Sequence, residues 1–498
     1  MATSQPEAIR SQLGLWDAIS IIIGIIIGAT IYQTAPFILQ NVSGPWTGLW
    51  VWVLGGLLTL VGALCFAELA AAYPHCGGDY IYQTRAYGRA VGFAFAWAQL
   101  VAVRTAGGIG ALAYVFGNYA RQLWDLGPHS SLLYAALAIV ILSLMNVLGV
   151  TTGKQTQNVL TAAKVLGLGG VLVVGLLSFF WPQTEQPRVQ QASASSGSFA
   201  LAMVLVLYAY SGWNEAAYVA AELRNRRRNI VLALVLATVG VTVIYVLVNA
   251  AYIVALGFDG ARASHAVAAD VLRIPLGESG SKAMSLLVVI SALGAVNGMI
   301  FTGSRVYSAF GADHSVFALM GRWNPRLGAP VWSLVIQAII CLAMVVLVEF
   351  SQEWRSQIAR LATTLGLTQI VSKSTGTGGF EALVICTSPV FWFFLLLSGL
   401  SLFVLRYKDR DIERPFRVPA YPLVPLLFCA SCGYMLYSSI EYAYKNAREE
   451  SLVVALLMLA GIPFYLVSRS RAMPNSQAGT PGPVRGPNDN ETAKPGGA

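Results

Sequence analysis

Charged residues are scarce in this chain. Only 11% of its 498 residues are Asp, Glu, Lys or Arg, whereas 56% are hydrophobic. Soluble globular domains carry about 25% charged residues, so this composition excludes an ordinary water-soluble protein. The mean hydropathy of +0.63 agrees with that exclusion. The sequence therefore predicts an integral membrane protein whose outer surface faces lipid.

Histidine and cysteine are also rare, with four and six residues respectively. The histidines have no metal-ligand spacing, and the cysteines do not form a disulfide framework. Cys429 and Cys432 have the spacing of a metal or redox pair, but their apolar setting suits free cysteine as a small hydrophobe. No nucleophile elbow, phosphate-binding loop or zinc-protease motif is found. We therefore predict that the protein is not an enzyme and has no metal site or cofactor.

Long apolar runs dominate what is present. About twelve of them can cross a hydrocarbon core of about 30 Å, which takes roughly twenty helical residues. Their continuous hydrophobicity favours helices over barrel strands, which would alternate with a period of two. The predicted fold class is an all-α integral membrane protein. The predicted spans are 16–39, 46–73, 91–120, 131–150, 158–181, 199–221, 230–257, 283–311, 330–349, 380–405, 420–442 and 452–468.

Three parts are expected along the chain. Residues 1–14 form an N-terminal segment, 15–472 a transmembrane domain and 473–498 a tail. The tail is rich in Pro, Gly and Asn without apolar periodicity, so we expect it to be disordered. The connection 351–379 is long, polar and glycine-rich at its end, and it is interpreted either as a lid or as a spacer.

The distribution of basic residues predicts the orientation. Of the 32 Lys and Arg residues, nineteen fall on the side of the predicted termini, ten on the opposite side and three within spans. By the positive-inside rule, both termini are cytoplasmic, in a multi-pass protein of the cell (inner or plasma) membrane. The net charge of +9 follows these loops, so it does not indicate a nucleic-acid partner.

A lysine lies within the apolar part of the fifth predicted span. Lys164 stands about a third of the way in, after Thr161-Ala162-Ala163. A lysine at the bilayer centre costs roughly 2.5–3.5 kcal/mol, so one that is retained usually faces a protein-lined or wet interior. The alternative is snorkelling, because its Cα lies only about 10 Å from the predicted edge at Gln157. The first interpretation makes Lys164 functional, and the second does not.

Two predicted spans contain interruptions at similar depth. The first span reads Gly24-Ile25-Ile26-Ile27-Gly28-Ala29-Thr30, and the sixth reads Tyr208-Ala209-Tyr210-Ser211-Gly212. Transporters built from inverted repeats bind substrate where paired helices break near the midplane. The alternative is that Gly24 and Gly28 form a helix-packing face and that Ser211-Gly212 is only a kink.

Helix breaks expose backbone groups that suit a zwitterion. Amides near Gly28, Ala29 and Thr30 lie at a positive dipole end and suit a carboxylate. Carbonyls near Ile26, Tyr208 and Ser211 suit an ammonium. An amino acid carries both groups, so the pair of breaks predicts an amino acid site.

Arg104 is a second intramembrane cation, in the third predicted span. Its candidate partners are Glu68 and Glu215, and a structural salt bridge is expected because buried guanidinium groups are commonly kept by pairing. Glu215 follows the sixth-span break. It either faces the substrate or points along a wet cytoplasmic path.

Several motifs resemble a known family over residues 13–468. They are Gly28-Ala29-Thr30-Ile31-Tyr32, Ala67-Glu68-Leu69, Tyr73-Pro74-His75-Cys76-Gly77-Gly78-Asp79-Tyr80, Asn158 to Lys164, Tyr210-Ser211-Gly212-Trp213-Asn214, Asn297-Gly298, Ser304-Arg305 and Arg414-Pro415-Phe416-Arg417-Val418-Pro419. The sequence resembles the amino acid-polyamine-organocation superfamily, and within it the L-type amino acid transporter branch.

This resemblance implies a fold. It implies two inverted five-helix repeats, a LeuT-like fold, with discontinuous first and sixth helices and two peripheral helices. Helices one to five would cover about 16–181, six to ten about 199–405, and eleven and twelve about 420–468.

The resemblance also implies residue roles. The break at Gly28 to Thr30 would hold the substrate carboxylate, and the break at Tyr208 to Ser211 would hold the amine, with Tyr208 as an aromatic gate. Lys164 matches a lysine whose ammonium stands where sodium-coupled relatives bind a cation, which implies sodium independence. The predicted substrate site comprises Ile26, Gly28, Ala29, Thr30, Ile31, Tyr208, Ser211 and Gly212.

Two residues depart from the family pattern at the first break. Thr30 replaces a more usual glycine, and Ala29 replaces a frequent serine, so the identity of the amino acid stays open. Some relatives pair with a glycoprotein through an external cysteine. The corresponding connection, Gln122 to Ser130, has none, so no disulfide-linked subunit is expected.

We predict a sodium-independent amino acid transporter that works by alternating access and exchanges neutral L-amino acids. Its partners are the small-molecule substrate and the lipid bilayer. A proton-coupled symporter is the first alternative, because an amine buried among apolar neighbours loses its proton more easily. A membrane sensor that binds an amino acid without moving it is the second.

Overall fold

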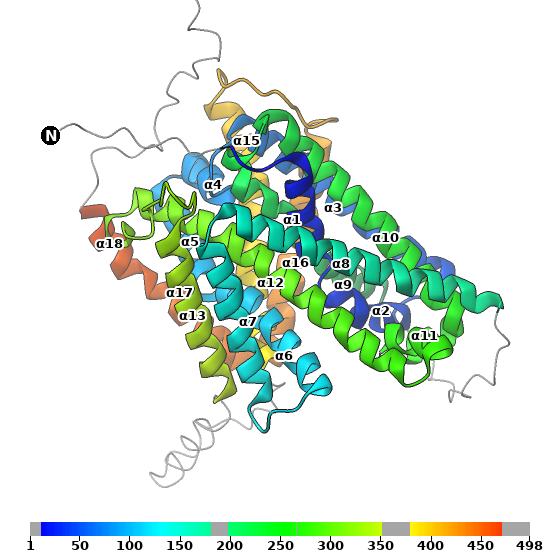
Figure 1. Ribbon diagram of the computed structural model, residues 1–498. Coiled ribbons are helices and arrows are strands. Elements are labelled where there is room, and N and C mark those ends of the chain that lie inside the picture. The colour runs from blue at the N-terminus through cyan, green and yellow to red at the C-terminus, as the bar shows by residue number, and fades with distance from the viewer. Residues whose placement is uncertain (1–10, 181–197, 265, 351–378, 471–498) are drawn as a thin grey trace, which may run out of the picture.

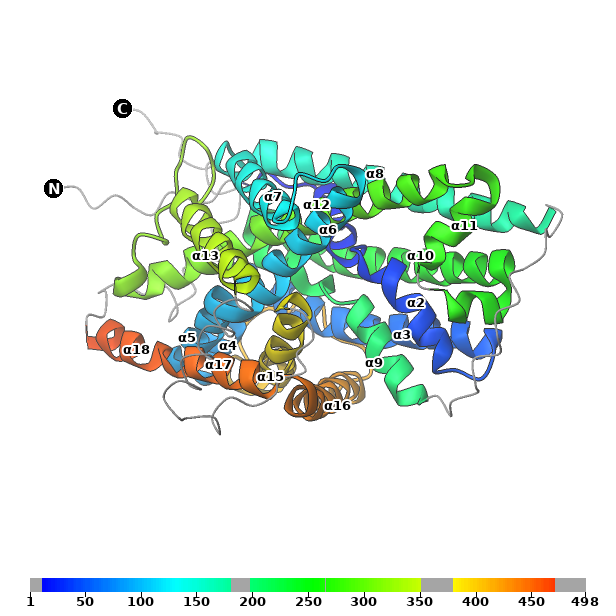
Figure 2. The same ribbon diagram turned by 90° about the horizontal axis from the view of Figure 1, so that it is seen from below.

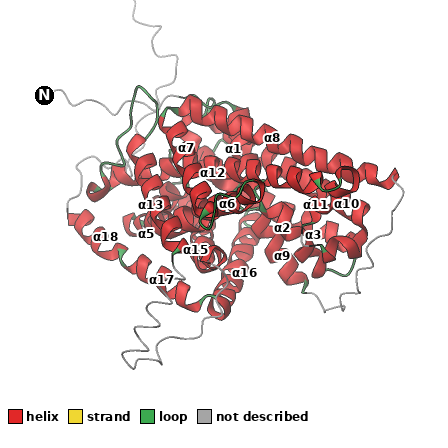
Figure 3. Cartoon of the chain, turned by 60° about the horizontal axis from the view of Figure 1, so that its bottom comes forward, coloured by secondary structure: helices red, strands yellow, loops and turns green. Residues whose placement is uncertain are grey.

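The computed structural model describes residues 11–180, 198–264, 266–350 and 379–470. Within these residues every regular element is a helix, and strand pairing is limited to two isolated bridges (Figures 1 and 3). The predicted tail, nearly all of the 351–379 connection and most of the predicted N-terminal segment lie outside the described residues.

The first half of the chain forms helices up to residue 180. They are α1 (Leu15–Ile26), α2 (Thr30–Gln40), α3 (Pro45–Ala72), α4 (Asp79–Tyr87), α5 (Arg89–Ala98), the π-helix η1 (Gln99–Gly110), α6 (Ala111–Leu123), α7 (Ser130–Val147), α8 (Val150–Leu177) and η2 (Ser178–Phe180).

The second half begins at residue 199. Its helices are α9 (Phe199–Ala209), the 3-10 helix η3 (Trp213–Glu222), α10 (Arg226–Ala263), α11 (Val267–Leu276), α12 (Ser279–Asp313), η4 (Ser315–Phe317), α13 (Val331–Glu349), α15 (Gly379–Lys408), α16 (Leu423–Asn446), α17 (Arg448–Leu459) and α18 (Gly461–Ser470).

Nine helical spans in the described residues are long and apolar enough to cross a membrane, and the bent pair α1 and α2 makes a tenth. Val331–Leu347 in α13 is a shorter apolar helix. The count of twelve predicted spans stays a prediction, because neither α13 nor the pair α9 and η3 is among these spans. The short helix α11 was not among the predicted spans.

The broken helices lie in the middle of the bundle. Helix α1 packs against α8, α10, α12 and η3, so the first half of one broken helix contacts the second half of the other. Figure 2 shows α15 to α18 along one edge, away from α1 and α8. The site region is therefore enclosed by helices from both halves of the chain.

Helix α8 begins earlier than the sequence indicated. We expected the span to start at 158, but α8 starts at Val150. Gly149 has a φ of +131°, which glycine adopts without strain, and it turns the chain directly from α7 into α8. The polar residues from Thr151 to Gln157 therefore form the first two turns of a helix, and Lys164 lies at its middle.

Candidate functional site

The first break separates α1 from α2. Residues 27–29 are non-helical, and the two helix axes differ by 51°. The N–H of Gly28 donates to the carbonyl of Ile26 at 2.7 Å, which closes a tight turn. Beyond it, Thr30 and Ile31 form the first turn of α2, where backbone N–H groups have no intrahelical acceptor. This break confirms the predicted discontinuity of the first helix.

Gly24 and Gly28 have different surroundings. A Cβ on Gly24 would lie 2.0 Å from the side chain of Gln157, so this glycine allows close packing of α1 on α8. A Cβ on Gly28 would meet nothing nearer than 3.8 Å. The packing interpretation therefore holds for Gly24, whereas Gly28 is buried with room for a Cβ, which would lie 3.9 Å from the Leu112 side chain.

The second break separates α9 from η3 at residues 210–212. Gly212 has a φ of +100°, and a Cβ there would lie 2.6 Å from the Cγ2 of Ile25. Glycine is therefore required both by the backbone conformation and by the close approach to α1. The sixth predicted span is discontinuous as expected, although the break lies slightly later than Tyr208.

The predicted residues of this second break are placed beside it. Tyr208 lies in the last turn of α9, and its carbonyl accepts from the N–H of Ser211 at 3.1 Å. Both side chains are half-buried. Their assignment to substrate binding stays a prediction.

Tyr245 of α10 joins the two breaks. Its hydroxyl lies 2.9 Å from the carbonyl oxygen of Ile26 and 3.3 Å from that of Ala209. The Ile26 carbonyl is predicted to bind the substrate ammonium. In this conformation it accepts hydrogen bonds from the Gly28 N–H and from the Tyr245 hydroxyl. Sequence reasoning missed Tyr245. The signal that would have found it is a hydroxyl in the middle of an apolar helix, because buried tyrosines usually need a partner.

Replacing Tyr245 by phenylalanine is expected to reduce transport about tenfold, because it removes the only side-chain hydroxyl that contacts both breaks among the described residues. The measurement is the initial rate of radiolabelled amino acid uptake into proteoliposomes. Tyr210→Phe is the matched control, since the Tyr210 hydroxyl donates to the Trp52 carbonyl at 3.1 Å instead. Equal losses in both variants would contradict a specific role for Tyr245.

Lys164 reaches the first break from α8. Its Nζ donates to the carbonyls of Gly24 at 2.7 Å and Ile27 at 2.9 Å, and to that of Ser291 in α12 at 2.8 Å. The side chain is fully buried. Three protein carbonyls hold the ammonium, which rules out the snorkelling interpretation. The lysine therefore ties the end of α1 to α12.

The space for Lys164 is made by a glycine and a polar network. A Cβ on Gly294 would lie 2.8 Å from the lysine Nζ, so a larger residue there would collide with the ammonium. One turn away, Asn297 donates to the side chain of Gln157 at 2.8 Å and accepts from Asn146 at 2.8 Å. These contacts hold α7, α8 and α12 together around the lysine.

Arg104 and Glu215 form a buried ion pair. The guanidinium donates two hydrogen bonds of 2.9 Å to the two carboxylate oxygens, and a further one of 3.1 Å to the Thr302 hydroxyl. Both side chains are almost fully buried. The π-helical turn η1 carries Arg104, and η3 carries Glu215. Glu215 is thus the partner of Arg104, and its carboxylate faces the arginine.

Glu68, the other candidate partner, is paired elsewhere. Its carboxylate accepts from Arg406 at 2.8 and 2.5 Å and from the Val418 N–H at 2.7 Å. These contacts fasten the end of α3 to α15 and to the segment that follows it, so Glu68 is not the partner of Arg104.

A second buried ion pair joins α12 to the end of η3. Arg305 of α12 pairs with Glu222 at 2.8 Å, and both side chains are 1% exposed. Beside this pair, the Leu13 N–H donates to the Glu222 carbonyl at 3.0 Å, and the Arg224 N–H donates to the Leu13 carbonyl at 2.9 Å. The residues before α1 are therefore bound to the end of η3.

Two broken helices that meet inside a bundle of membrane-spanning helices are the arrangement of a secondary transporter. The family model for amino acid permeases matches residues 13–462, and the chain belongs to that family. This confirms the predicted all-α, LeuT-like fold and the resemblance to the amino acid-polyamine-organocation superfamily. The protein is a multi-pass membrane protein that transports amino acids, and it is not an enzyme.

Named relatives agree with this assignment. The chain is 28% identical to the human b(0,+)-type amino acid transporter 1 over 469 residues, covering 92% of this chain and 88% of that protein. It is 29% identical to the mouse large neutral amino acids transporter small subunit 2 over 474 residues, covering 92% of this chain and 81% of that protein.

Proposed function

We propose that this permease exchanges neutral L-amino acids across the cell membrane without sodium, by alternating access. The observation that carries sodium independence is the Lys164 ammonium bonded to the carbonyls of Gly24, Ile27 and Ser291. In transporters of this type, carbonyls at unwound helix segments coordinate the coupling cation. A sodium ion at the same carbonyls would have to displace a covalently attached cation.

The substrate site in this proposal lies between the two breaks. The substrate carboxylate binds N–H groups at the break from Gly28 to Ile31, at the positive end of α2. In the conformation described, the Gly28 N–H is bonded to the Ile26 carbonyl, so the N–H groups of Ala29, Thr30 and Ile31 are the ones that bind the carboxylate. The ammonium binds carbonyls near Ile26, Tyr208, Ser211 and Gly212. The contact between Gly212 and Ile25 supports one shared site, because it brings the two breaks together.

Orientation and partners follow from the loops. We infer that both termini are cytoplasmic, because nineteen of 32 basic residues lie on their side of the predicted topology. The mouse relative is named as a small subunit. We infer that any subunit of this chain associates without a disulfide bond, since residues 122–130 contain no cysteine.

The test is uptake of a radiolabelled amino acid mixture into proteoliposomes in sodium-free buffer, with and without unlabelled amino acids inside. Exchange predicts uptake only when amino acid is present inside, and no change when sodium is added. Uptake into empty vesicles that rises with an inward proton gradient would instead establish a proton-coupled symporter. Saturable binding without uptake under any condition would indicate a sensor.

Thr30→Gly is expected to shift substrate choice toward bulkier amino acids. Thr30 is half-buried at the first position of α2, where the substrate carboxylate is placed. Removing its side chain enlarges the pocket, and differences of a methylene in a pocket are worth about tenfold or more. The measurement is inhibition of labelled uptake by amino acids of increasing size. Thr34→Ala, one turn further along α2, is the control, and identical inhibition profiles would contradict the idea.

A further inference from the structure

A basic pocket lies in the connection between α12 and α13. Its cavity of about 490 Å³ is lined by Arg322, Trp323, Asn324, Arg326 and Trp332, together with two neighbouring apolar residues. Arg322 and Arg326 are exposed, and neither forms an ion pair within the part of the chain that the structure describes. No acidic residue occurs between His314 and Val331. The pocket therefore carries two uncompensated positive charges.

The backbone of the basic pocket is fixed by its own hydrogen bonds. The Asn324 side-chain oxygen accepts from the N–H groups of Arg326 at 3.0 Å and Leu327 at 3.2 Å. The Asn324 N–H donates to the Ala329 carbonyl at 3.0 Å. The two arginines are thus presented by an ordered turn.

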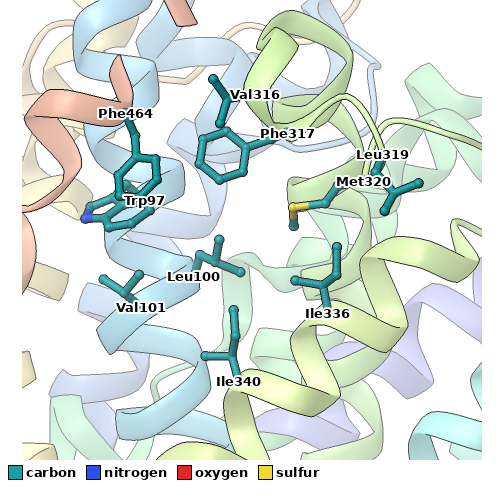
Figure 4. A pocket seen from close by; sticks show the side chains of 10 residues that line it. All are labelled: Trp97, Leu100, Val101, Val316, Phe317, Leu319, Met320, Ile336, Ile340 and Phe464. Atoms are coloured by element: carbon teal, nitrogen blue, oxygen red, sulfur yellow. The ribbon is translucent and has the colours of Figure 1, made fainter. Parts of the chain in front are cut away.

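An apolar pocket of about 360 Å³ is lined in part by the same segment and by α13. Figure 4 shows Leu100 and Val101 of η1 facing Ile336 and Ile340 of α13 across an open space, with Phe464 of α18 near its upper end. Met320, two residues before Arg322, also lines this apolar pocket. The two cavities therefore share the segment that follows α12.

Helix α13 connects the two cavities. Trp332 lines the basic pocket, and Ile336 and Ile340 line the apolar pocket, at intervals of four residues that place them on one helix face. Eight residues of helix span about 12 Å, close to the thickness of one leaflet of a hydrocarbon core of about 30 Å.

The same helix faces lipid next to these cavities. Trp332, Ile339 and Val346, seven residues apart, are 45%, 60% and 41% exposed. Tryptophan is enriched at the boundary between hydrocarbon and headgroups, so Trp332 marks the depth of the headgroups. The basic pocket therefore lies at headgroup level, and the apolar pocket at acyl-chain level.

We propose that one anionic phospholipid binds here, with its phosphate between Arg322 and Arg326 and one acyl chain in the apolar pocket. Guanidinium groups bind phosphate oxygens through paired hydrogen bonds, and the apolar pocket suits a hydrocarbon chain. A free phosphate could bind the two guanidinium groups, but it has no hydrocarbon chain to occupy the apolar pocket. The apolar pocket therefore favours a lipid over a free phosphate.

The proposed lipid site lies close to the buried ion pair between Arg305 and Glu222. The Trp323 ring lies 5.9 Å from the guanidinium carbon of Arg305, whose partner Glu222 ends η3. A headgroup packed on Trp323 is therefore one side chain away from this buried ion pair. Anionic lipid is expected to change the rate of uptake, whichever amino acid is carried.

The test uses the purified full chain, delipidated in detergent, with lipid retention measured by native mass spectrometry. Phosphatidylglycerol is expected to be retained over phosphatidylcholine. Each basic residue near an anionic lipid surface contributes about fivefold to binding, so R322Q/R326Q should lower retention about 25-fold. R410Q/R417Q is the matched control, because both arginines are exposed on another connection. R322K/R326K keeps the charge and should retain most of the binding.

The apolar contact is tested separately. Ile340→Trp fills the apolar pocket, so it should lower retention of phosphatidylglycerol severalfold. A second measurement is the rise in the midpoint of thermal unfolding when inorganic phosphate is added. Ile340→Trp should leave that rise unchanged. Unchanged lipid retention in R322Q/R326Q would overturn the proposal. Equal stabilisation by inorganic phosphate and by phosphatidylglycerol, with no effect of Ile340→Trp, would overturn it too, because the cavity would then be a phosphate site. Retention does not depend on the transported substrate, so these outcomes are distinct from failure of the exchange assay.

Discussion

Lys164→Ala is expected to reduce amino acid uptake at least about 100-fold while the protein still inserts into the membrane. The variant leaves the carbonyls of Gly24, Ile27 and Ser291 without their donor. Each buried hydrogen bond to a charged group contributes about 1.5–3 kcal/mol, so loss of three disrupts the tie between α1 and α12. The measurement is initial uptake into proteoliposomes, normalised to the amount of inserted protein.

Lys154→Ala provides the comparison within the same helix. Lys154 contacts Asp17 at 3.1 Å at the partly exposed end of α8, so its loss should reduce uptake only severalfold. Size-exclusion profiles of both variants check that they remain folded. Normal uptake by Lys164→Ala would remove this lysine from the transport mechanism.

Arg104→Leu is expected to destabilise the protein strongly, by about 3–5 kcal/mol, because it leaves the Glu215 carboxylate buried without its partner. The measurement is the midpoint of thermal unfolding in detergent, together with the yield of monodisperse protein. Arg104→Leu combined with Glu215→Leu should recover most of this loss, because replacing both members of a buried pair with apolar residues is often tolerated.

The double variant also decides the role of Glu215. If the carboxylate serves only to pair with Arg104, the double variant should transport; loss of uptake with restored stability would place Glu215 in the substrate pathway. Arg121→Leu is the control within the same continuous span, Arg89–Leu123, because its contact with Asp125 is half-exposed and should not affect unfolding measurably. A thermal midpoint unchanged in Arg104→Leu would contradict a structural role for the pair.

The location of the helix breaks was largely predictable. Gly28 in one apolar span and Ser211-Gly212 in another predict interruptions because they occur at similar depth in two spans, as in transporters built from repeats. The structure breaks both helices there. The start of α8 was not predictable to the same degree. The polar residues after Val150 read as a loop, but the structure shows that they are helical, and the positive φ of Gly149 makes the turn from α7 into this helix.

Contacts between distant residues were not predictable. The sequence left Arg104 with two candidate partners, since a single sequence contains no distances, and the structure pairs it with Glu215. It also gave no reason to connect Tyr245 with Ile26 and Ala209.

The sequence by itself determined that this is a helical membrane protein with two interrupted helices and a lysine that is costly to bury. Composition and the order of apolar runs are local properties, and the low polarity of the bilayer leaves helices as the structure for such runs. The tertiary structure decided that Lys164 is enclosed by carbonyls instead of snorkelling, and that Tyr245 bridges both breaks. These outcomes depend on which helices pack together, because hydrogen bonds between different helices form only where packing brings donor and acceptor within about 3 Å.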